Sequence, residues 1–329
     1  MKVIKSILIC MGVICLALGV TACSGFGSMK YENAENYSVG DTSFTETIEN
    51  IDVDWVSGKV KIATHADESV LLTEKTDFAA TEDMRVHWWL DGETLRVKFC
   101  ASGMGISIFG YGQKELTITI PETAVLAEIK VSTSSADFST EEINANKISV
   151  STSSGSMNVS CQSDKINLNS MSGNIKIKQS KKANSVDIDT SSGKIEANIN
   201  QCEDVYLDSV SGKIEANVTE CNRAEINTTS GGIKVIGNKI EKATIKSTSG
   251  TIECRLKEDF KKCTLNAISG EINLFLPGGI GFVANVNSTS GSFNSDFALK
   301  RNGNTYTCND GSAQIDLTTT SGNISVKEL

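Results

Sequence analysis

The sequence predicts an all-β protein, a single-stranded parallel β-helix (solenoid) of about 19-residue coils, with a less regular N-terminal β region and a C-terminal capping hairpin. The first observation is a Ser-Gly step that recurs every 18 to 21 residues from Ser154-Gly155 to Ser290-Gly291. The second is the alternating apolar run on each side of every step. A fixed period of this length indicates stacked repeats rather than a packed globule.

Each repeat has the alternation expected of two short strands. In the repeat at Ser211-Gly212, the apolar positions are Val205, Leu207, Ile214, Ala216 and Val218. Apolar residues at every second position are typical of a strand with one buried face. Two strands of about five residues cannot bury their inner faces alone, so we expect successive coils to pair at ~4.8 Å and to share one core.

The Ser-Gly step is expected to form the corner between the two strands. Glycine accepts a positive φ, and the adjacent serine hydroxyl can bond to a local backbone group. A valine in place of Gly212 is therefore expected to destabilise its coil, either through a forced positive φ or through a clash at the corner.

The N-terminus indicates export. Two lysines precede an apolar run from Ile7 to Val20, and the run ends in Val20-Thr21-Ala22-Cys23, which resembles the lipobox of bacterial lipoproteins. The resemblance implies cleavage before Cys23 and a diacylglycerol on its thiol. We therefore expect a lipid-anchored protein of the cell membrane that faces the extracytoplasmic side. An ordinary signal peptide or a short membrane anchor is the alternative.

The charge of the chain argues against two classes of partner, nucleic acid and anionic lipid. Removing residues 1–22 takes away two lysines, so the formal charge changes from −9 to −11. An acidic chain without a basic stripe is not expected to bind nucleic acid, or to adhere to anionic lipid by charge. The membrane is thus expected to be a partner through the N-terminal lipid alone.

The chain divides into four predicted segments. They are a lipoprotein signal peptide (1–22), a flexible tether (23–43), an N-terminal β region (44–125) and the repeat domain with its cap (126–329). In the β region, the stretch from Ile51 to Ile62 fits the repeat template, and Asp91-Gly92 is expected to join two strands as a hairpin. The last repeat follows a longer interval, in which Arg301-Asn302-Gly303-Asn304 is expected to turn a hairpin that caps the final coils.

The ten cysteines of an exported chain could signal disulfides. Cys10 and Cys15 leave with the signal, Cys23 is the lipid site, and the other seven fall almost entirely on inward positions of the repeat. We expect these seven to pack as buried thiols. Cys202 and Cys221 occupy the same position in successive coils, so they are the one pair considered for a bridge. A zinc site is not expected, because the sequence has no C-x-x-C motif or Cys/His cluster.

The first candidate site is a group of outward carboxylates on neighbouring coils. It consists of Asp187, Asp189, Asp208 and Glu225, with Tyr206 among them. Stacking places adjacent members ~5 Å apart, a spacing that could hold a cation or pair an acid with a base. Solvated surface carboxylates are the commoner interpretation of such a group.

The second candidate site is aromatic. Trp88, Phe109 and Tyr111 are predicted to contact a glycan or a partner protein, and the last two lie in a glycine-rich stretch that could instead pack against the first coils. Trp88 and Trp89 are expected to face opposite sides of one strand. No catalytic residue, metal ligand or cofactor site is predicted.

The lipobox, the LTITIP step at Leu116–Pro121 and the run of Ser-Gly coils ending in AQIDLTTTSGNISV resemble the DUF4097 family of candidate adhesins, over about residues 44–329. The resemblance implies an envelope protein of repeated β-strands and brings no catalytic residues. We therefore expect a non-catalytic cell-envelope lipoprotein, displayed at the surface as an adhesin-like binding module for a glycan or a surface protein. A structural or signalling accessory of the envelope is the alternative, and a polysaccharide-acting β-helix enzyme is the third.

Overall fold

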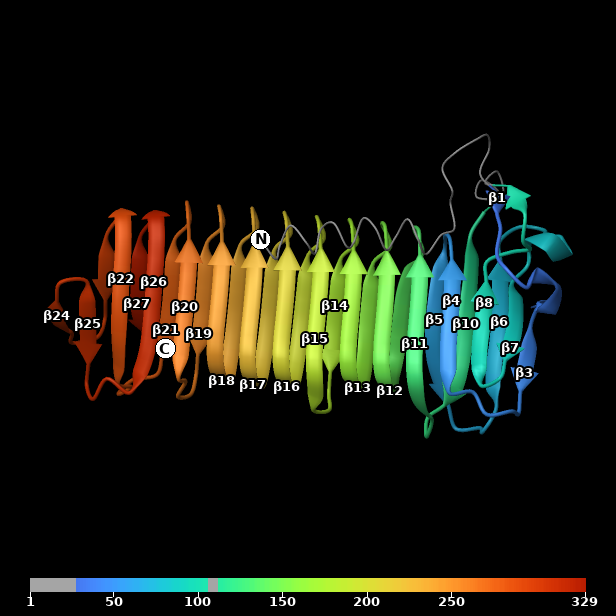
Figure 1. Cartoon of the computed structure of the whole chain (residues 1–329), viewed down its shortest axis with the longest axis horizontal. Coiled ribbons are helices and arrows are strands. Elements are labelled where there is room, and N and C mark those ends of the chain that lie inside the picture. Colours follow the sequence, from blue (N-terminus) through green and yellow to red (C-terminus); the bar gives the residue numbers. More distant parts are fainter. Residues whose placement is uncertain (1–27, 106–111) are drawn as a thin grey trace. The chain divides into compact units, whose positions relative to one another are not determined.

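The protein is built from β-strands, and a computed structural model describes it over residues 28–105 and 112–329 (Figure 1). The chain divides into two compact units, unit 1 (Met1–Asn174) and unit 2 (Ile175–Leu329). Over the described ranges the only helical turns are two 3-10 helices, η1 (Ala34–Asn36) and η2 (Glu82–Met84). The all-β prediction is therefore confirmed. None of the helices in these ranges is long and apolar enough to cross a membrane.

Unit 1 combines parallel and antiparallel strands. Its strands are β1 (Ser28–Met29), β2 (Ser38–Val39), β3 (Thr42–Phe44), β4 (Asn50–Trp55), β5 (Lys59–His65), β6 (Val70–Thr76), β7 (His87–Asp91), β8 (Thr94–Lys98), β9 (Met104–Gly105), β10 (Lys114–Pro121), β11 (Val125–Thr133), β12 (Asp137–Thr152) and β13 (Met157–Ser170). Strands β8, β4, β11, β12 and β13 pair in parallel in that order, and β10, β5 and the start of β12 do the same.

Antiparallel strands surround the first coil of unit 1. The hairpin predicted at Asp91-Gly92 is confirmed, because β7 pairs antiparallel with β8. Strand β2 pairs with β7, while β6 lies between β10 and β3. The repeat template predicted for Ile51 to Ile62 corresponds to β4 and β5, whose apolar side chains are buried.

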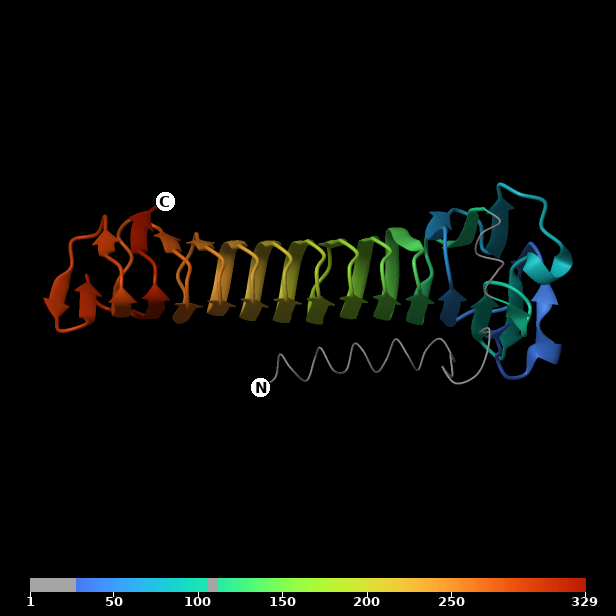
Figure 2. The same ribbon diagram turned by 90° about the horizontal axis from the view of Figure 1, so that it is seen from above.

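Unit 2 is a stack of parallel strands. Its strands are β14 (Ile175–Gln179), β15 (Ala183–Thr190), β16 (Ile195–Ser209), β17 (Ile214–Thr228), β18 (Ile233–Ser247), β19 (Ile252–Leu256), β20 (Lys262–Ala267), β21 (Ile272–Leu276), β22 (Phe282–Ser290), β23 (Phe293–Ser295), β24 (Lys300–Asn302), β25 (Thr305–Cys308), β26 (Ala313–Ser321) and β27 (Ile324–Glu328). Ile195 pairs with Ile214, and Ile214 pairs with Ile233, so each coil lies on the equivalent residues of the next. Figure 2 shows the two rows of strands that these coils form.

The core of each unit consists of the inward apolar positions predicted from the alternation. Around the Ser211-Gly212 corner, all five of these side chains are at most 2% exposed: Val205, Leu207, Ile214, Ala216 and Val218. Burial of a Val, Leu or Ile side chain stabilises a fold by roughly 1.5–3 kcal/mol. Side-chain burial repeated in every coil therefore stabilises a fold whose single coils could not persist alone.

Buried hydroxyl groups hold the corners. Thr228 Oγ1 accepts a hydrogen bond from the backbone N–H of Gly231 (3.1 Å), and Ser209 Oγ accepts one from Gly212 (2.8 Å). The prediction that the serine next to the glycine has this role is wrong, because Ser230 is exposed. The buried hydroxyl lies three residues before the glycine, where the side chain points into the coil.

The corner glycines are required by close packing of successive coils. A Cβ atom on Gly212 would lie 1.8 Å from the carbonyl oxygen of Gly193 in the previous coil. Gly212 is not among the residues with a positive φ. Of the two causes predicted for a destabilising substitution there, the clash is confirmed and the positive φ is wrong.

At the end of unit 2, the order of coils in space differs from their order in sequence. Strand β26 lies between β20 and β22, and β27 lies between β21 and β23, so the last repeat of the chain inserts between two earlier ones. The hairpin predicted at Arg301–Asn304 joins β24 to β25, and β25 pairs antiparallel with β22. The long interval before the last repeat allows the chain to leave the stack and return one coil earlier.

The seven cysteines of the described chain are all buried, as predicted. Cys202 and Cys221 are register partners on β16 and β17 and are present as thiols. Burial raises the pKa of Cys202 to about 11 and that of Cys221 to about 12. Both side chains therefore remain protonated near neutral pH and pack as small apolar groups.

Candidate functional site

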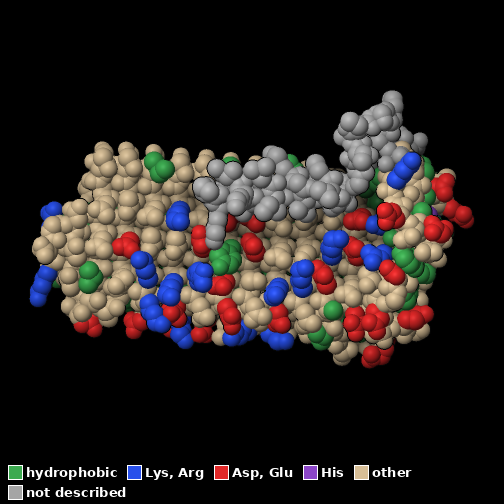
Figure 3. Space-filling view, viewed as in Figure 1, with side chains coloured by type: hydrophobic (Ala, Val, Ile, Leu, Met, Phe, Trp, Pro, Cys, Tyr) green, Lys and Arg blue, Asp and Glu red, His purple; other side chains and the backbone are tan. Residues whose placement is uncertain are grey.

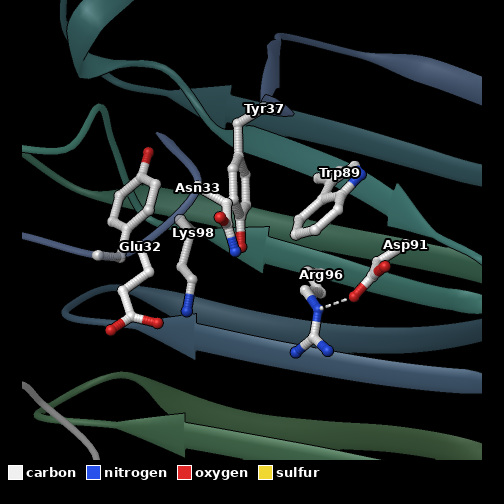
Figure 4. Close-up of a pocket in the computed structure, with 8 residues that line it drawn as sticks. Glu32, Asn33, Tyr37, Trp89, Asp91, Arg96 and Lys98 are labelled. Carbon is white, nitrogen blue, oxygen red and sulfur yellow. Dashed lines mark hydrogen bonds and ion pairs between the residues drawn. The ribbon is translucent and has the colours of Figure 1, made fainter. Parts of the chain in front are cut away.

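A pocket of about 340 Å³ lies in unit 1, over the outer face of the β7–β8 hairpin (Figure 4). Its lining combines three aromatic side chains with charged and amide groups: Tyr31, Glu32, Asn33, Tyr37, Trp89, Asp91, Arg96 and Lys98. A volume of this size falls at the lower end of the range of about 300–1,000 Å³ that is typical of small-molecule sites.

The strands of the hairpin supply half of the lining. Trp89 and Asp91 lie two residues apart on β7, and Arg96 and Lys98 lie two residues apart on β8, so all four side chains emerge on one face of the hairpin. Trp89 pairs with Arg96 in the antiparallel register. The hairpin thus fixes the relative positions of these groups through its backbone pairing.

The segment around η1 supplies the other half. Tyr31, Glu32 and Asn33 precede this short helix, and Tyr37 follows it. Tyr31 is anchored at both ends, because its hydroxyl donates to the Cys100 carbonyl oxygen (3.1 Å) and its backbone N–H donates to Ser102 Oγ (3.1 Å). These bonds hold the segment against the hairpin.

The three rings contact one another. The centroids of Tyr31 and Tyr37 are 4.9 Å apart with their planes at 58°, and those of Tyr37 and Trp89 are 5.8 Å apart at 63°. Burial raises the pKa of Tyr37 to about 12 and raises the pKa of Tyr31 as well. Both phenols therefore keep their protons at neutral pH and can act as hydrogen-bond donors.

The two basic side chains of the pocket are already paired with carboxylates. Arg96 forms ion pairs with Asp91 (2.9 Å) and with Asp52 (3.2 Å), and Lys98 contacts Asp54. Asp52 and Asp54 lie on β4, opposite Arg96 and Lys98 in the parallel register. The hydrogen bond with Asp91 is the main reason that the pKa of Arg96 is raised.

Several polar groups of the pocket have no hydrogen-bond partner within the described chain. They are the Asn33 amide, the Tyr37 hydroxyl and the Trp89 indole N–H, and the Glu32 carboxylate forms no ion pair there either. Asn33 has a left-handed backbone (φ 55°, ψ 35°) and precedes η1 without capping it through its side chain. The pocket therefore offers both donors and acceptors to a bound molecule.

A buried ion pair lies deeper in unit 1. Lys114 Nζ is 2.7 Å from Glu74 Oε1, and both side chains are only 1% exposed. The Lys114 ammonium also donates to the Met84 carbonyl oxygen (2.6 Å) and lies 4.1 Å from the centroid of Phe99. Burial lowers the pKa of Lys114 and Glu74 opposes that effect. This pair is enclosed by protein and presents nothing to a ligand.

The predicted flexible tether (23–43) is wrong over residues 28–43, which form β1, η1, β2 and the start of β3. The polar composition of this segment suggested a linker, but its tyrosines pack on the hairpin. The spacing of Tyr31 and Tyr37 in an otherwise polar stretch was the available signal. Cys23, the predicted lipid site, lies outside the described residues.

The aromatic prediction named Trp88, but the ring that lines the pocket belongs to Trp89. Trp88 faces the other side of β7, where its ring packs edge-on against Phe44 (4.9 Å) and its indole N–H donates to the Gly40 carbonyl oxygen (3.0 Å). This difference could be predicted from the sequence, because residues two apart on a strand lie on the same face. Trp88 shares its face with the apolar Val86 and Leu90, whereas Trp89 shares its face with the polar His87 and Asp91. Phe109 and Tyr111 lie outside the described residues, so their contact stays a prediction.

The predicted carboxylate group forms two columns on unit 2. Asp187, Tyr206 and Glu225 are successive register partners, and so are Asp189, Asp208 and Asn227. Asp208 Oδ1 accepts a hydrogen bond from the Asn227 amide (2.8 Å). Lys246 continues the second column and was missed as a member of it.

Burial raises the pKa values of three of these carboxyls. The pKa of Asp189 rises to about 7, mainly through burial and then through the charges of Asp187 and Asp208. Burial is also the main reason that the pKa values of Asp187 and Asp208 are raised. Within the described ranges no three His, Cys, Asp or Glu side chains come together closely enough to hold a metal ion. A ligand role for these columns stays a prediction.

The remaining outer positions of unit 2 carry mixed-sign ladders, as the space-filling view illustrates (Figure 3). Lys194 pairs with Glu215 of the next coil (2.7 Å), Lys239 with Glu220 (2.9 Å) and Lys261 with Glu241 (2.7 Å). Exposed pairs of this kind contribute at most about 1 kcal/mol each. Charged pairs between neighbouring strands support the register of the strands and the solubility of the surface. These side chains therefore do not indicate a ligand site.

Comparison with known proteins identifies the family. The Toastrack DUF4097 family model matches residues 48–235 and 161–327. Among solved structures, the chain is similar to a candidate adhesin from Parabacteroides distasonis (10% identity, covering 89% of this chain and 97% of that one, TM-score 0.46). It is also similar to a candidate adhesin from Parabacteroides merdae (13%, 91% and 98%, TM-score 0.44) and to a candidate lipid-binding protein from P. distasonis (13%, 89% and 97%, TM-score 0.39). No curated protein matched. Because the family model covers more than half of its length, the chain belongs to the Toastrack DUF4097 family.

Proposed function

We propose that this protein is a non-catalytic, adhesin-like binding module of the bacterial cell envelope, and that the aromatic pocket of unit 1 is its contact site. The observation that carries the proposal is the composition of that pocket. Rings and open hydrogen-bonding groups converge on one paired hairpin, while the groups of the outer ladders are largely paired with one another. Convergent polar groups in a partly apolar pocket are the usual form of a small-molecule site.

The proposed location rests on the N-terminal sequence. A charged start, an apolar run and Val20-Thr21-Ala22-Cys23 are the features of an exported lipoprotein, so we propose a diacylglycerol on Cys23 that anchors the chain on the extracytoplasmic side. Cys23→Ser should then release the protein from the membrane fraction and abolish its labelling by a radioactive fatty acid. A Cys23→Ser variant that still incorporates the label would refute the anchor.

We further infer that the coils of unit 2 wind as a single-stranded parallel β-helix. The parallel register between equivalent residues and the close approach of successive corner glycines support this winding. Such a stack has little freedom to rearrange, because the inner coils are paired on both sides. Its proposed role is rigid support.

A structural or signalling accessory of the envelope is the second candidate. The mixed-sign ladders favour it, because their side chains pair with one another between successive coils. This function would need no ligand in the pocket of unit 1. The binding experiment below therefore separates the two candidates.

The test uses the full chain, purified in detergent and mixed with envelope fragments of the producing cells. Binding is measured by cosedimentation. Trp89→Ala should lower the affinity at least about tenfold, since it removes one wall of the pocket. Phe275→Ala is the matched control, because the Phe275 ring also lies beneath an arginine (3.9 Å to Arg255 Cζ) but belongs to unit 2 and is not part of the lining of this pocket. Absence of binding would favour the accessory function, and equal loss in both variants would contradict the pocket as the contact site.

A further inference from the structure

We infer that the pocket of unit 1 binds a neutral saccharide. This inference rests on the proposed function and adds the class of ligand. Three features of the pocket carry it, namely the angles between its rings, the pairing of its charges and the polar groups that remain open.

The ring angles favour a puckered ligand over a flat aromatic one. Neither contacting pair of rings is parallel, since Tyr31 and Tyr37 meet at 58° and Tyr37 and Trp89 at 63°. A flat ring such as a nucleobase is best held between parallel faces, and neither contacting pair of rings provides them. A pyranose presents C–H groups in several directions, so it can contact aromatic surfaces that are tilted relative to one another.

The charges disfavour an anionic ligand. Arg96 is paired with Asp91 and Asp52, and Lys98 with Asp54, so a uronate or a phosphate would have to compete with carboxylates that are already in place. Glu32 adds a further negative charge at the pocket wall. An anion would therefore meet more negative than positive charge.

The same arrangement disfavours a cationic ligand. Aromatic rings attract cations, but the Arg96 guanidinium already lies 5.9 Å from the centroid of Trp89 and the Lys98 ammonium 5.6 Å from that of Tyr31. A quaternary ammonium group would therefore find two of the three rings already occupied by cations of the chain. A neutral molecule leaves every existing ion pair intact.

The polar groups of the pocket that have no partner within the described chain match the hydroxyl groups of a sugar. The Tyr37 phenol and the Trp89 indole N–H donate, the Glu32 carboxylate accepts, and the Asn33 amide does both. The raised pKa of Tyr37, about 12, keeps its hydroxyl as a donor at neutral pH. A sugar hydroxyl can donate and accept, so several hydroxyls on one ring match this mixture. Figure 4 shows the Asn33 amide beside the Tyr37 ring, with Trp89 of the hairpin on one side and Glu32 on the other.

The variants follow from the local geometry. Trp89→Ala removes an aromatic wall, while Trp89→Phe keeps one ring and loses the indole N–H together with part of the aromatic surface. Asn33→Gly deletes the amide and preserves the left-handed backbone, because glycine adopts φ 55° without strain. Phe275→Ala again serves as the control outside the pocket.

The experiment presents the full chain, in a polyoxyethylene detergent, to an array of neutral, uronic acid and amino sugar oligosaccharides, followed by calorimetric titration of the hits. A sugar-headed detergent is avoided because it would compete. We expect binding to neutral saccharides, weakened at least about tenfold by Trp89→Ala, about fivefold by Asn33→Gly and less by Trp89→Phe. Melting curves of each variant check that it folds.

The other outcomes separate this inference from the proposed function. Binding to uronic acids or amino sugars alone would overturn the argument from charge. Binding of neutral sugars that Trp89→Ala and Asn33→Gly leave unchanged would overturn the assignment to this pocket. If no saccharide binds but envelope fragments still bind in a Trp89-dependent way, the inference fails and the proposed function stands.

Discussion

Replacing Gly231 by alanine should destabilise unit 2, whereas the same replacement at the adjacent Gly232 should not. A Cβ on Gly231 would lie 1.9 Å from the carbonyl oxygen of Gly212 and 2.6 Å from its carbonyl carbon. A Cβ on Gly232 would meet only the carbonyl oxygen of Thr251, at 3.6 Å. Because the atoms that clash with residue 231 belong to the backbone, no side chain can rotate away and the corner itself must open.

Opening the corner removes local hydrogen bonds. The Gly231 N–H donates to Thr228 Oγ1 (3.1 Å), and the Ser230 N–H donates to the Val210 carbonyl oxygen (2.9 Å). Loss of two such bonds costs about 1 kcal/mol each, and backbone strain adds about 1 kcal/mol. The free energy of unfolding should therefore decrease by about 3 kcal/mol. Gly232→Ala should change it by less than about 1 kcal/mol, and can stabilise by restricting the unfolded chain.

Urea unfolding followed by circular dichroism measures both changes, and native-state hydrogen exchange shows where they act. In Gly231→Ala the corner amides of the coils that contain Gly212 and Gly231 should exchange faster, while those of unit 1 should not. Equal stabilities of the two variants would refute the stacked corner geometry. Both residues are glycines at neighbouring positions, so the effect of a Gly→Ala substitution on the unfolded chain is the same in the two variants and cancels in the comparison.

Other predictions concern buried polar groups. Thr228→Val removes the hydroxyl that accepts from Gly231, so the free energy of unfolding should fall by about 1–2 kcal/mol in urea titration; no change would contradict the role of the hydroxyl. Lys114→Met takes away the close ion-pair partner of the buried Glu74 carboxylate, which keeps only the 3.9 Å contact with Arg85 Nε and the hydrogen bond from the Val86 N–H. Stability should fall by about 3 kcal/mol, and Glu74→Gln added to that variant should restore part of the loss. The pKa of Asp189, about 7, lies above its unfolded value of 3.8, so the folded state binds more protons between these values. Stability should therefore rise by about 2 kcal/mol as the pH falls from about 8 to about 4, and Asp189→Asn should flatten this dependence. The seven buried cysteines should react with a thiol reagent only after unfolding, and rapid reaction of the native chain would argue against their burial.

The repeats could be predicted from the sequence because the same apolar alternation and the same Ser-Gly step recur in each of them. Alternation identifies the inward face of a strand, and a constant period aligns equivalent residues of successive coils. This is why burial of Val205 and Leu207 and the pairing of Cys202 with Cys221 followed from spacing alone. The sequence left two reasons for the corner glycine open, a positive φ or a clash, because the contact that decides between them lies between residues of two coils.

The candidate site was harder to predict because it has no repeat. Tyr31 and Tyr37 lie in a polar segment whose composition is that of a linker, and only the hairpin surface that they meet explains why the segment is folded. The carboxylates that lie opposite Arg96 and Lys98 come from β4, which is not adjacent to β8 in the sequence. Non-local pairing therefore decides the site, as it decides the insertion of β26 between β20 and β22.

Site-specific photocrosslinking in the producing cells shows whether the pocket of unit 1 contacts an envelope component. Benzoylphenylalanine is introduced in place of Glu32, an exposed residue of the pocket lining, in one full-length variant and in place of Phe275 in another, and the cells are irradiated. A crosslinked envelope product is expected from position 32 and none from position 275. No product at position 32, or equal products at both positions, would contradict the pocket as the contact site.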